Sequence, residues 1–333
     1  MLWCCPIHHG ALTQRGTDLV ADCCSATFPL VAGIPDLRTS HAFWMDLEDD
    51  RRRAADLESG VAAEDVAGSV RWVFGRRPGW TKAMIERRTA SVMDAVAKLH
   101  EDCRSWLAPA IDRRGPVLDV GCGPGMMLAA MPGDRPRIGI DVSLEWLVVA
   151  KRLTRAAGVE AWLAAGHAES LPLSDEFFGT VIALDVLEHV GDQAAMLREI
   201  DRVLMPGGVF AAATPNRYSL AAEPHVYLWG VGWLPRAWQK GYVRRRGGLS
   251  YDFTRLLSIN ELRKMIDSHS SLRALIDPAP VPASELRRFS RRRRWLGETY
   301  NRLLAFPPFR AAARMVGPFF HLTAVKPAAR TDR

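Results

Sequence analysis

The chain has 333 residues, of which 48% are hydrophobic, enough for one main domain with appendages. Lysine and arginine total 44 against 37 aspartate and glutamate, and the resulting charge of +7 favours acidic partners without choosing among nucleic acid, anionic lipid and phosphorylated substrates. Apolar stretches fall far short of the ~20 residues of a membrane helix, and the first residues lack a signal-peptide pattern, so we expect a cytoplasmic protein.

The order of segments predicts three parts. Residues 1–38 hold four of the six cysteines, and we expect them to form a small self-contained unit. Residues 39–80 are charged, show no strand pattern and carry an aromatic patch, so we interpret them as a linker or lid region. Residues 81–333 are expected to form the main domain, with insertions at about 217–257 and 280–317.

The main domain begins with a helix and continues as an alternation of strands and helices. Apolar residues recur at helical spacing from Ile85 to Trp106. Short apolar runs then alternate with helices, which is typical of a parallel α/β sheet. Ser143 is expected to cap one helix, and Ser258 with Glu261 to form a capping box for another. The candidate strands are 117–120, 137–141, 160–165, 180–185, 209–214, 271–276 and 319–325.

The first strand runs into a glycine-rich turn, Asp119-Val120-Gly121-Cys122-Gly123-Pro124-Gly125. Its glycines let the backbone pass close to a ligand. Asp119 suits an ammonium group and would repel a pyrophosphate, and Met126 stands where a dinucleotide fingerprint needs its third glycine. Asp141 follows Gly121 by 20 residues, the spacing at which a carboxylate reaches ribose hydroxyls. This favours a methionine-derived cofactor over NAD(P). Alternatively, the turn only joins strand to helix and Asp141 caps the next helix.

With these residues the main domain resembles the class I S-adenosylmethionine-dependent methyltransferases, especially the ubiquinone/menaquinone-biosynthesis and type 11 groups. The resemblance covers about residues 80–333. It implies a Rossmann-like α/β fold with a seven-stranded, mostly parallel sheet, helices on both faces and a reversed last strand. It rests on LDVGCGPG (118–125), IGIDVS (138–143), AGHAESLPLSDEFFGTVIALDVLEHV (165–190), LMPGG (204–208) and ATPNR (213–217).

The resemblance also implies a binding site for S-adenosylmethionine. Asp119 and the backbone of the turn would hold the amino-acid part, Asp141 the ribose, and His167, Ala168 and Glu169 would lie along adenine. His167 departs from the family pattern, which usually has aspartate there. A neutral imidazole can accept a hydrogen bond from the adenine amino group and a protonated one cannot, so we expect cofactor affinity to fall in acid. The full predicted set is Asp119, Gly121, Cys122, Gly123, Gly125, Asp141, Val142, His167, Ala168, Glu169 and Asp185.

Candidate residues for methyl transfer follow the fourth and fifth strands, where ligands sit in such sheets. Asp185, His189 and His225 are the predicted catalytic residues. Together with Glu188 they could hold Mg²⁺, which would lower the pKa of a substrate hydroxyl. Some quinone O-methyltransferases and small-RNA 2′-O-methyltransferases carry a similar E-x-x-E-H motif. Two alternatives remain: a histidine acts as a bare general base, or Glu188-His189 simply begins the next helix.

The N-terminal unit resembles the zinc-ribbon segment found before some methyltransferases and in small methyltransferase-activator proteins. Such a ribbon needs two ligand pairs for a tetrahedral zinc site. Cys5 and His8 match the first pair. Cys24 matches half of the second, and because its partner position holds Ala21, Cys23 or Asp22 would have to substitute. The alternative is a degenerate ribbon that folds without metal.

The insertions suggest the kind of acceptor. Leu286, Phe289, Leu296, Tyr300 and Leu303 are placed on one helical face, with Arg291 to Arg294 among them. A basic amphipathic helix suits peripheral contact with an anionic membrane, or a lid over a hydrophobic or phosphorylated acceptor. Alternatively, the insertions only pack on the sheet. We expect O-methylation of a small-molecule or lipid-linked acceptor.

Other functions compete with this prediction. An rRNA or tRNA methyltransferase fits the basic balance, but the arginines are split between two late segments and no RNA-reading motif is found. A catalytically silent, methyltransferase-like subunit that activates a partner fits His167 and the incomplete cysteine set. The sequence makes no prediction of oligomeric state.

Overall fold

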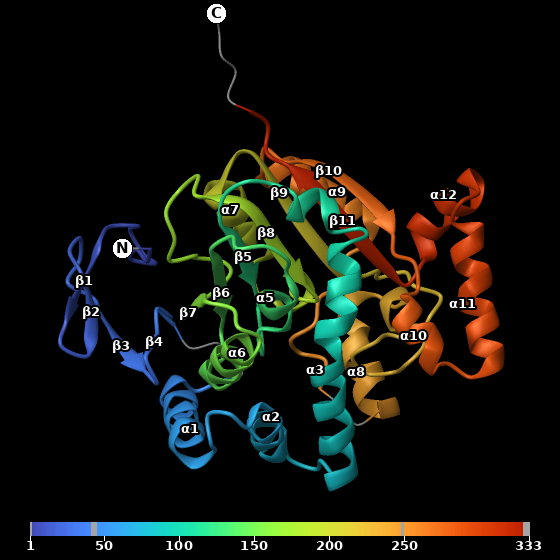
Figure 1. The fold of residues 1–333 in the computed structure, drawn as a ribbon. Helices are drawn as coiled ribbons and strands as arrows, with labels where there is room; N and C mark the ends of the chain where they lie inside the picture. The colour runs from blue at the N-terminus through green and yellow to red at the C-terminus, as the bar shows by residue number, and fades with distance from the viewer. Residues whose placement is uncertain (1, 41–44, 248–249, 329–333) are drawn as a thin grey trace, which may run out of the picture.

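The computed structural model describes residues 2–40, 45–247 and 250–328. Its main feature is a seven-stranded sheet in the order β10-β11-β9-β8-β5-β6-β7 (Figure 1). The five strands from β7 to β9 run parallel, whereas β11 is antiparallel to both β9 and β10. This confirms the mostly parallel sheet with a reversed last strand. The strands are β5 (Val117–Val120), β6 (Arg137–Asp141), β7 (Ala161–Ala165), β8 (Phe178–Leu184), β9 (Leu204–Pro215), β10 (Arg273–Pro278) and β11 (Phe319–Val325).

Helices cover both faces of this sheet. Val181 and Ala183 of β8 lie in one apolar core with α7 (Gln193–Val203) and α9 (Ile259–His269). Ile182 lies in the other, with α3 (Lys82–Cys103), α4 (Ala108–Ile111), α5 (Met126–Ala130) and α6 (Leu144–Ala156). This alternation follows from the two-residue period of a strand. Both predicted caps are confirmed, Ser143 on α6 and the Ser258–Glu261 capping box on α9.

Some predicted bounds need correction. The strand predicted at 209–214 begins already at Leu204, because the chain passes directly from α7 into β9 through irregular pairing with β8. The predicted amphipathic face from Leu286 to Leu303 is split in two. Phe289 and Ser290 adopt extended backbone angles between α10 (Ala283–Arg288) and α11 (Arg291–Leu303). The remaining helices of the insertions are α8 (Arg236–Gly247) and α12 (Pro307–Val316).

The N-terminal unit is a four-stranded antiparallel sheet beside the main one (Figure 1). It attaches to the free edge of β7, where Asp36 forms a parallel bridge with Ala165 and the Leu37 amide donates to the Ala165 carbonyl at 2.8 Å. A second attachment joins the Cys4 amide to the Pro172 carbonyl at 2.9 Å. The unit therefore covers a sheet edge that would otherwise leave backbone groups unpaired. Its strands are β1 (Leu12–Arg15), β2 (Asp18–Ala21), β3 (Thr27–Val31) and β4 (Ile34–Pro35).

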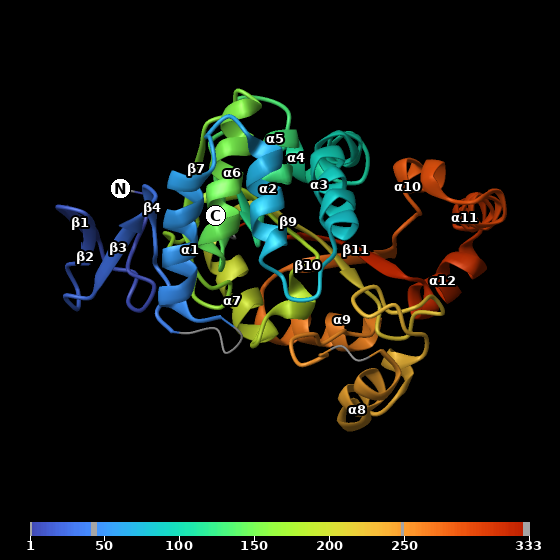
Figure 2. The same ribbon diagram turned by 90° about the horizontal axis from the view of Figure 1, so that it is seen from below.

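The segment predicted as a linker or lid contains two helices, α1 (Leu47–Gly60) and α2 (Val66–Gly75), which pack on α6 (Figure 2). Arg152 of α6 is buried between them and donates to Ser69 Oγ at 2.8 Å and to the Leu57 carbonyl at 3.2 Å. The division of the chain at residues 38 and 80 stays a prediction. No helix among the described residues is long and apolar enough to cross a membrane.

Candidate cofactor and methyl-transfer site

The three glycines of the turn after β5 have two different roles. Gly121, Gly123 and Gly125 all have positive φ angles, of 69°, 49° and 78°, which disfavour other residues. A Cβ atom on Gly121 would lie 2.4 Å from the Val186 side chain, and one on Gly125 would lie 2.8 Å from Ala150. A Cβ on Gly123 would meet no atom within 4 Å. Gly121 and Gly125 are thus required for packing, whereas Gly123 borders open space in which a ligand can lie.

Asp119 is a buried carboxylate at the end of β5. It is 3% exposed, and its Oδ2 has no hydrogen-bond partner within the part of the chain that the structure describes. Burial, followed by the nearby charge of Asp141, raises its pKa well above the usual range. An unpaired buried oxygen is costly unless a ligand satisfies it. The ammonium group of a methionine moiety would do so, and the residues present therefore fit the predicted cofactor.

Asp141, at the end of β6, organises the adjoining loops. Its Oδ2 accepts from the Gly123 amide at 2.8 Å and its Oδ1 from the Ser143 amide at 2.9 Å. Burial raises its pKa even though these hydrogen bonds oppose the shift. Each oxygen keeps acceptor capacity, so the carboxylate can still bind ribose hydroxyls. The predicted alternative, in which Asp141 only organises the turn, is compatible with the same contacts.

The residues predicted along adenine lie after β7. His167 Nε2 donates to the Ser40 carbonyl at 3.0 Å, which leaves Nδ1 as the acceptor of a neutral ring. Glu169 Oε1 accepts from the amides of Gly191 at 3.0 Å and Asp192 at 3.4 Å. Glu169 thus ties this segment to the loop before α7. Ala168 is buried between them.

The loop after β8 carries Asp185 and His189, two of the three predicted catalytic residues, and contacts the glycine turn through Val186. His225, the third, follows β9. Asp185 has a φ of 56°, a strained value for aspartate and one that clusters at functional sites. It is exposed, yet desolvation by the surrounding protein raises its pKa, with Lys98 opposing. Glu188, by contrast, is buried, and its Oε2 accepts from Thr214 Oγ1 at 2.9 Å.

Glu188, His189 and His225 meet in one cluster. Their ligand atoms lie within 4.8 Å of one another, whereas Asp185, the fourth residue of the predicted Mg²⁺ set, is not part of the group. Burial and the charge of Asp185 raise the pKa of Glu188 to about 7. Burial lowers the pKa of His189, whose Nδ1 donates to the Phe253 carbonyl at 3.0 Å.

Glu223 completes the cluster and was not predicted from the sequence. Its Oε1 lies 2.5 Å from His225 Nδ1, and its Oε2 accepts from the amides of His225 and Val226. Burial alone would lower the pKa of His225, but the hydrogen bond and charge of Glu223, assisted by Glu188, raise it. On the opposite side of the ring, Nε2 lies 3.8 Å from Glu188 Oε1. The only sequence signal for Glu223 is its position two residues before His225.

A buried ionic network links the N-terminal unit to the cofactor loops, and it too was missed from the sequence. Arg38, whose side chain is fully buried, contacts Asp36 and Asp50, each at 2.7 Å. Its Nη1 also donates to the Val142 carbonyl at 2.7 Å, next to Asp141. Asp50 Oδ2 in turn accepts from the Leu144 amide at 2.9 Å. The network therefore fixes both sides of the loop that carries Asp141.

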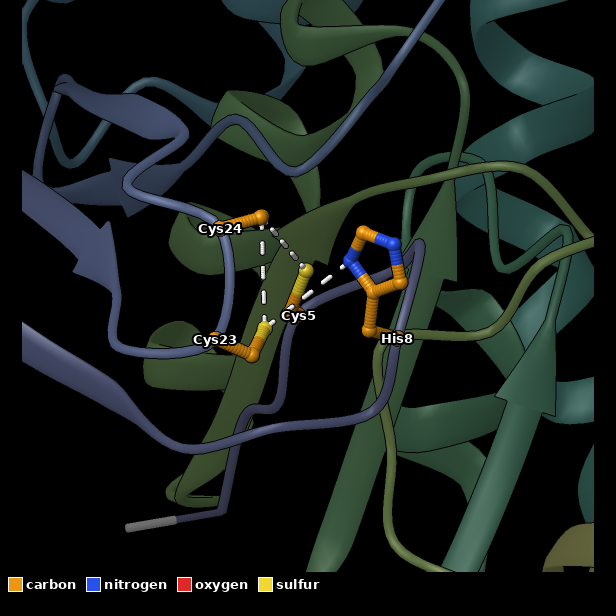
Figure 3. A group of neighbouring side chains, drawn as sticks. All are labelled: Cys5, His8, Cys23 and Cys24. Atoms are coloured by element: carbon orange, nitrogen blue, oxygen red, sulfur yellow. Dashed lines mark hydrogen bonds between the residues drawn. The ribbon is translucent and has the colours of Figure 1, made fainter.

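The predicted metal ligands of the N-terminal unit come together. Cys5, His8, Cys23 and Cys24 offer ligand atoms that all lie within 4.8 Å of one another, and the four side chains converge (Figure 3). Cys5 Sγ lies 3.8 Å from Cys24 Sγ, and Cys23 Sγ lies 4.0 Å from His8 Nδ1. Cys23 rather than Asp22 joins the group, since Asp22 accepts from Thr13 Oγ1 at 3.1 Å.

Comparisons with known proteins agree with this geometry. A family model described as "Methyltransferase domain" matches residues 118–212. The chain is 30% identical over 186 residues to the ubiquinone biosynthesis O-methyltransferase of Methylobacterium sp. (strain 4-46). The aligned region covers 54% of this chain and 68% of the relative. It is 33% identical over 193 residues to the protein of the same name from Azorhizobium caulinodans, with 55% and 74% covered.

Among solved structures, the YcgJ protein of Bacillus subtilis is similar over 69% of this chain and 100% of its own, with 21% identity and a TM-score of 0.45.

The two sequence relatives are matched over more than two thirds of their length. Both align at 30% identity or more. The chain belongs to the class I S-adenosylmethionine-dependent methyltransferases.

Proposed function

We propose that the protein methylates a hydroxyl oxygen of a small-molecule acceptor, with His225 as the general base. S-adenosylmethionine, held by Asp119, the glycine turn and Asp141, supplies an activated methyl group. The relatives named as O-methyltransferases support an oxygen acceptor. The observation that carries the proposal is the placement of His225 between two buried carboxylates, Glu223 and Glu188, beside the loop that contacts the glycine turn.

The cluster can take up the proton that a hydroxyl must lose. Because His225 Nδ1 donates to Glu223, the lone pair of the neutral ring is on Nε2. A hydroxyl held near Nε2 would pass its proton there, and Glu223 would stabilise the imidazolium that forms. His189, whose Nδ1 donates to a carbonyl, offers Nε2 as a further acceptor that can orient the substrate. Asp185 would help to position the substrate near the cofactor.

A divalent metal at Glu188, His189 and His225 is the alternative means of activating the hydroxyl. It predicts that EDTA-treated protein loses methyl transfer from labelled S-adenosylmethionine and regains it with Mg²⁺. The general-base proposal predicts activity that survives EDTA and falls about 10²- to 10⁴-fold in His225→Gln, the usual value of a positioned base. His269→Gln, at the C-terminal end of α9, is the matched control and should retain activity.

Zinc in the N-terminal unit is supported by the convergence of Cys5, His8, Cys23 and Cys24. Three sulfurs and one imidazole are a common donor set for structural zinc. Elemental analysis should find one zinc per chain, reduced at least tenfold in His8→Gln. The neighbouring His9→Gln should keep its zinc. Equal zinc in both variants, or none in the unmodified protein, would exclude the site.

Peripheral contact with an anionic membrane is supported by exposed aromatic side chains on the insertions. Trp229, Trp238 and Trp295 are between 61% and 67% exposed, and Arg244 to Arg246 and Arg291 to Arg294 accompany them. Tryptophan favours the interfacial region of a bilayer, and arginine favours anionic headgroups. The protein should sediment with phosphatidylglycerol vesicles and not with phosphatidylcholine. Binding should weaken in Trp238→Ala and Trp295→Ala but not in Trp162→Ala, which alters an exposed tryptophan of β7.

A further inference from the structure

A groove of about 810 Å³ lies outside the cluster just described. It is formed where α3, the segment before α8, and α10 meet, and α3 and α10 are neighbours in both views (Figures 1 and 2). Ion pairs from Lys98 to Glu285 and from Asp94 to Arg288 join these two helices. The residues that line the groove and matter for its chemistry are Trp80, Met84, Arg87, Arg88, Tyr227 and Arg288.

The groove has more positive charge than its acidic residues neutralise. Asp94 is paired with Arg288, and Glu86 with Arg71. Arg87 and Arg88 form no ion pair within residues 2–40, 45–247 and 250–328. The Arg88 guanidinium lies 6.0 Å from the centre of the Trp80 ring and 3.3 Å from the Tyr227 hydroxyl.

A third arginine, Arg77, lies next to the groove, beside Trp80, without lining it. The Arg77 guanidinium lies 5.1 Å from the same Trp80 ring. Burial, and then repulsion by Arg88, lowers the pKa of Arg77. Like charges held around one aromatic ring are unfavourable unless an anion joins them. The groove thus combines an apolar wall with a cationic rim.

The groove and the methyl-transfer cluster are connected by a single face of α3. Arg87, Ser91, Asp94 and Lys98 recur at three- and four-residue spacing, which places them on one side of the helix. Lys98, at the far end of this face, is close enough to Asp185 for its charge to lower the pKa of that carboxyl. At 1.5 Å per residue, Arg87 and Lys98 are separated by about 16 Å along the helix axis.

The wall of the groove opposite α3, formed by the segment with Tyr227, is also connected to the methyl-transfer cluster. Tyr227 stands two residues after His225, and its amide donates to the Glu223 carbonyl. Its φ of 56° is strained for tyrosine and directs the chain sharply out of the cluster. One tight turn therefore presents His225 to the cluster and Tyr227 to the groove.

We propose that the groove binds an anionic group, a phosphate or a carboxylate, at the end of an elongated, partly apolar acceptor whose hydroxyl reaches His225. Arg87 and Arg88 would bind the anion, with Trp80 and Met84 at the end of the groove away from His225. The apolar body would pass Tyr227, which lies beside Arg88, on its way to His225. Planar guanidinium groups match both phosphate and carboxylate oxygens. This inference rests on the proposed O-methylation and specifies the chemical class of its acceptor.

Calorimetry with decyl phosphate as the probe tests the groove directly. The unmodified protein should bind decyl phosphate and not decyltrimethylammonium, which has the same chain with the opposite charge. Affinity should fall at least tenfold in the double variant Arg87→Gln/Arg88→Gln. The matched double variant Arg113→Gln/Arg114→Gln, which alters two exposed, adjacent arginines between α4 and β5, should stay within twofold of the unmodified protein.

Three results would overturn the assignment: equal binding of both probes, undiminished binding in the groove variant, or an equal loss in the Arg113/Arg114 variant, which would indicate a diffuse charge effect. Binding of S-adenosylhomocysteine is measured in the same samples and should be unchanged in both variants, which verifies their fold. If the unmodified protein binds decyl phosphate but not S-adenosylhomocysteine, the proposed function fails and the groove does not.

Discussion

Asp119 is a residue whose unfavourable position points to a ligand. Its buried oxygen lacks a partner among the described residues, and its pKa is raised well above the usual range. In Asp119→Asn the shape remains but the charge that would bind an ammonium group is lost. We expect affinity for S-adenosylhomocysteine to fall at least tenfold, while the melting temperature stays equal or rises because a buried unpaired carboxylate is removed. Unchanged affinity in calorimetry would contradict this role.

Glu223 controls the protonation of His225. Its hydrogen bond and charge raise the pKa of His225 against the effect of burial. In Glu223→Gln the pKa of His225 should therefore move down, towards or below the ordinary value. Titration of the ring signals by NMR in EDTA-containing buffer measures this shift, with His269 as an internal reference. An unchanged or higher pKa for His225 in the variant would contradict this role of Glu223.

At this scale the sequence predicted residues carried by local motifs and missed those defined by tertiary contacts. Asp119 and Asp141 are recognisable because a glycine turn and a fixed spacing accompany them. Glu223 and Arg38 act through partners that are brought near only by folding, Arg38 across 104 residues to Val142. No periodicity or spacing marks such a pair in a single sequence.

Among the connections between elements, Arg38 joins three parts of the fold: β4, α1 and the loop after β6. Lysine at this position keeps the charge but cannot contact Asp36, Asp50 and the Val142 carbonyl together. We expect Arg38→Lys to weaken S-adenosylhomocysteine binding about three- to tenfold. Arg51→Lys is the control, because Arg51 contacts Asp36 at 2.7 Å without reaching the cofactor loop. An equal effect of both variants would indicate general destabilisation instead.

His321 in β11 should make the stability of the protein depend on pH. Its ring stacks on Trp106 at 3.8 Å, and burial, assisted by Lys98, lowers its pKa to about 4. Because the unfolded chain binds a proton more readily, His321 contributes stability above about pH 6.5 that is lost as the pH falls through 4. The shift corresponds to about 3 kcal/mol.

The test compares His321→Phe, which keeps a ring against Trp106, with the unmodified protein. Chemical denaturation gives the free energy of unfolding of each protein at pH 7 and at pH 4. We expect the decrease from pH 7 to pH 4 to be about 3 kcal/mol smaller in the variant than in the unmodified protein. The same pH dependence in both proteins would contradict the assignment to His321.

Element types in the main domain followed from the sequence, because strand and helix periods are local. The helices α1 and α2 were not predicted within residues 39–80. For α1 the reason is that the helix is strongly charged and that its buried positions include Asp50, a residue type that pattern reading counts as exposed. The break at Phe289–Ser290 was likewise invisible, since both flanking segments keep helical spacing.

At the scale of the molecule, three parts surround the carboxyl ends of the parallel strands. The N-terminal unit extends the sheet at β7 and fixes the Asp141 loop through Arg38. The long α3 helix and the insertions form the opposite side and enclose the arginine groove. The family pattern predicted the central sheet, whereas the acceptor that we propose depends on α3 and the insertions.

The proposed binding site of the methyl donor consists of the glycine turn and two carboxylates, Asp119 and Asp141. Titration calorimetry of the unmodified protein with S-adenosylhomocysteine, and separately with NADH, is the decisive test of this site. We predict one molecule of S-adenosylhomocysteine per chain, with binding lost in a double variant of Asp119→Asn and Asp141→Asn, and no heat from NADH. Saturable binding of NADH, with no response to S-adenosylhomocysteine or S-adenosylmethionine, would show that the turn is a dinucleotide site and not a methyl-donor site.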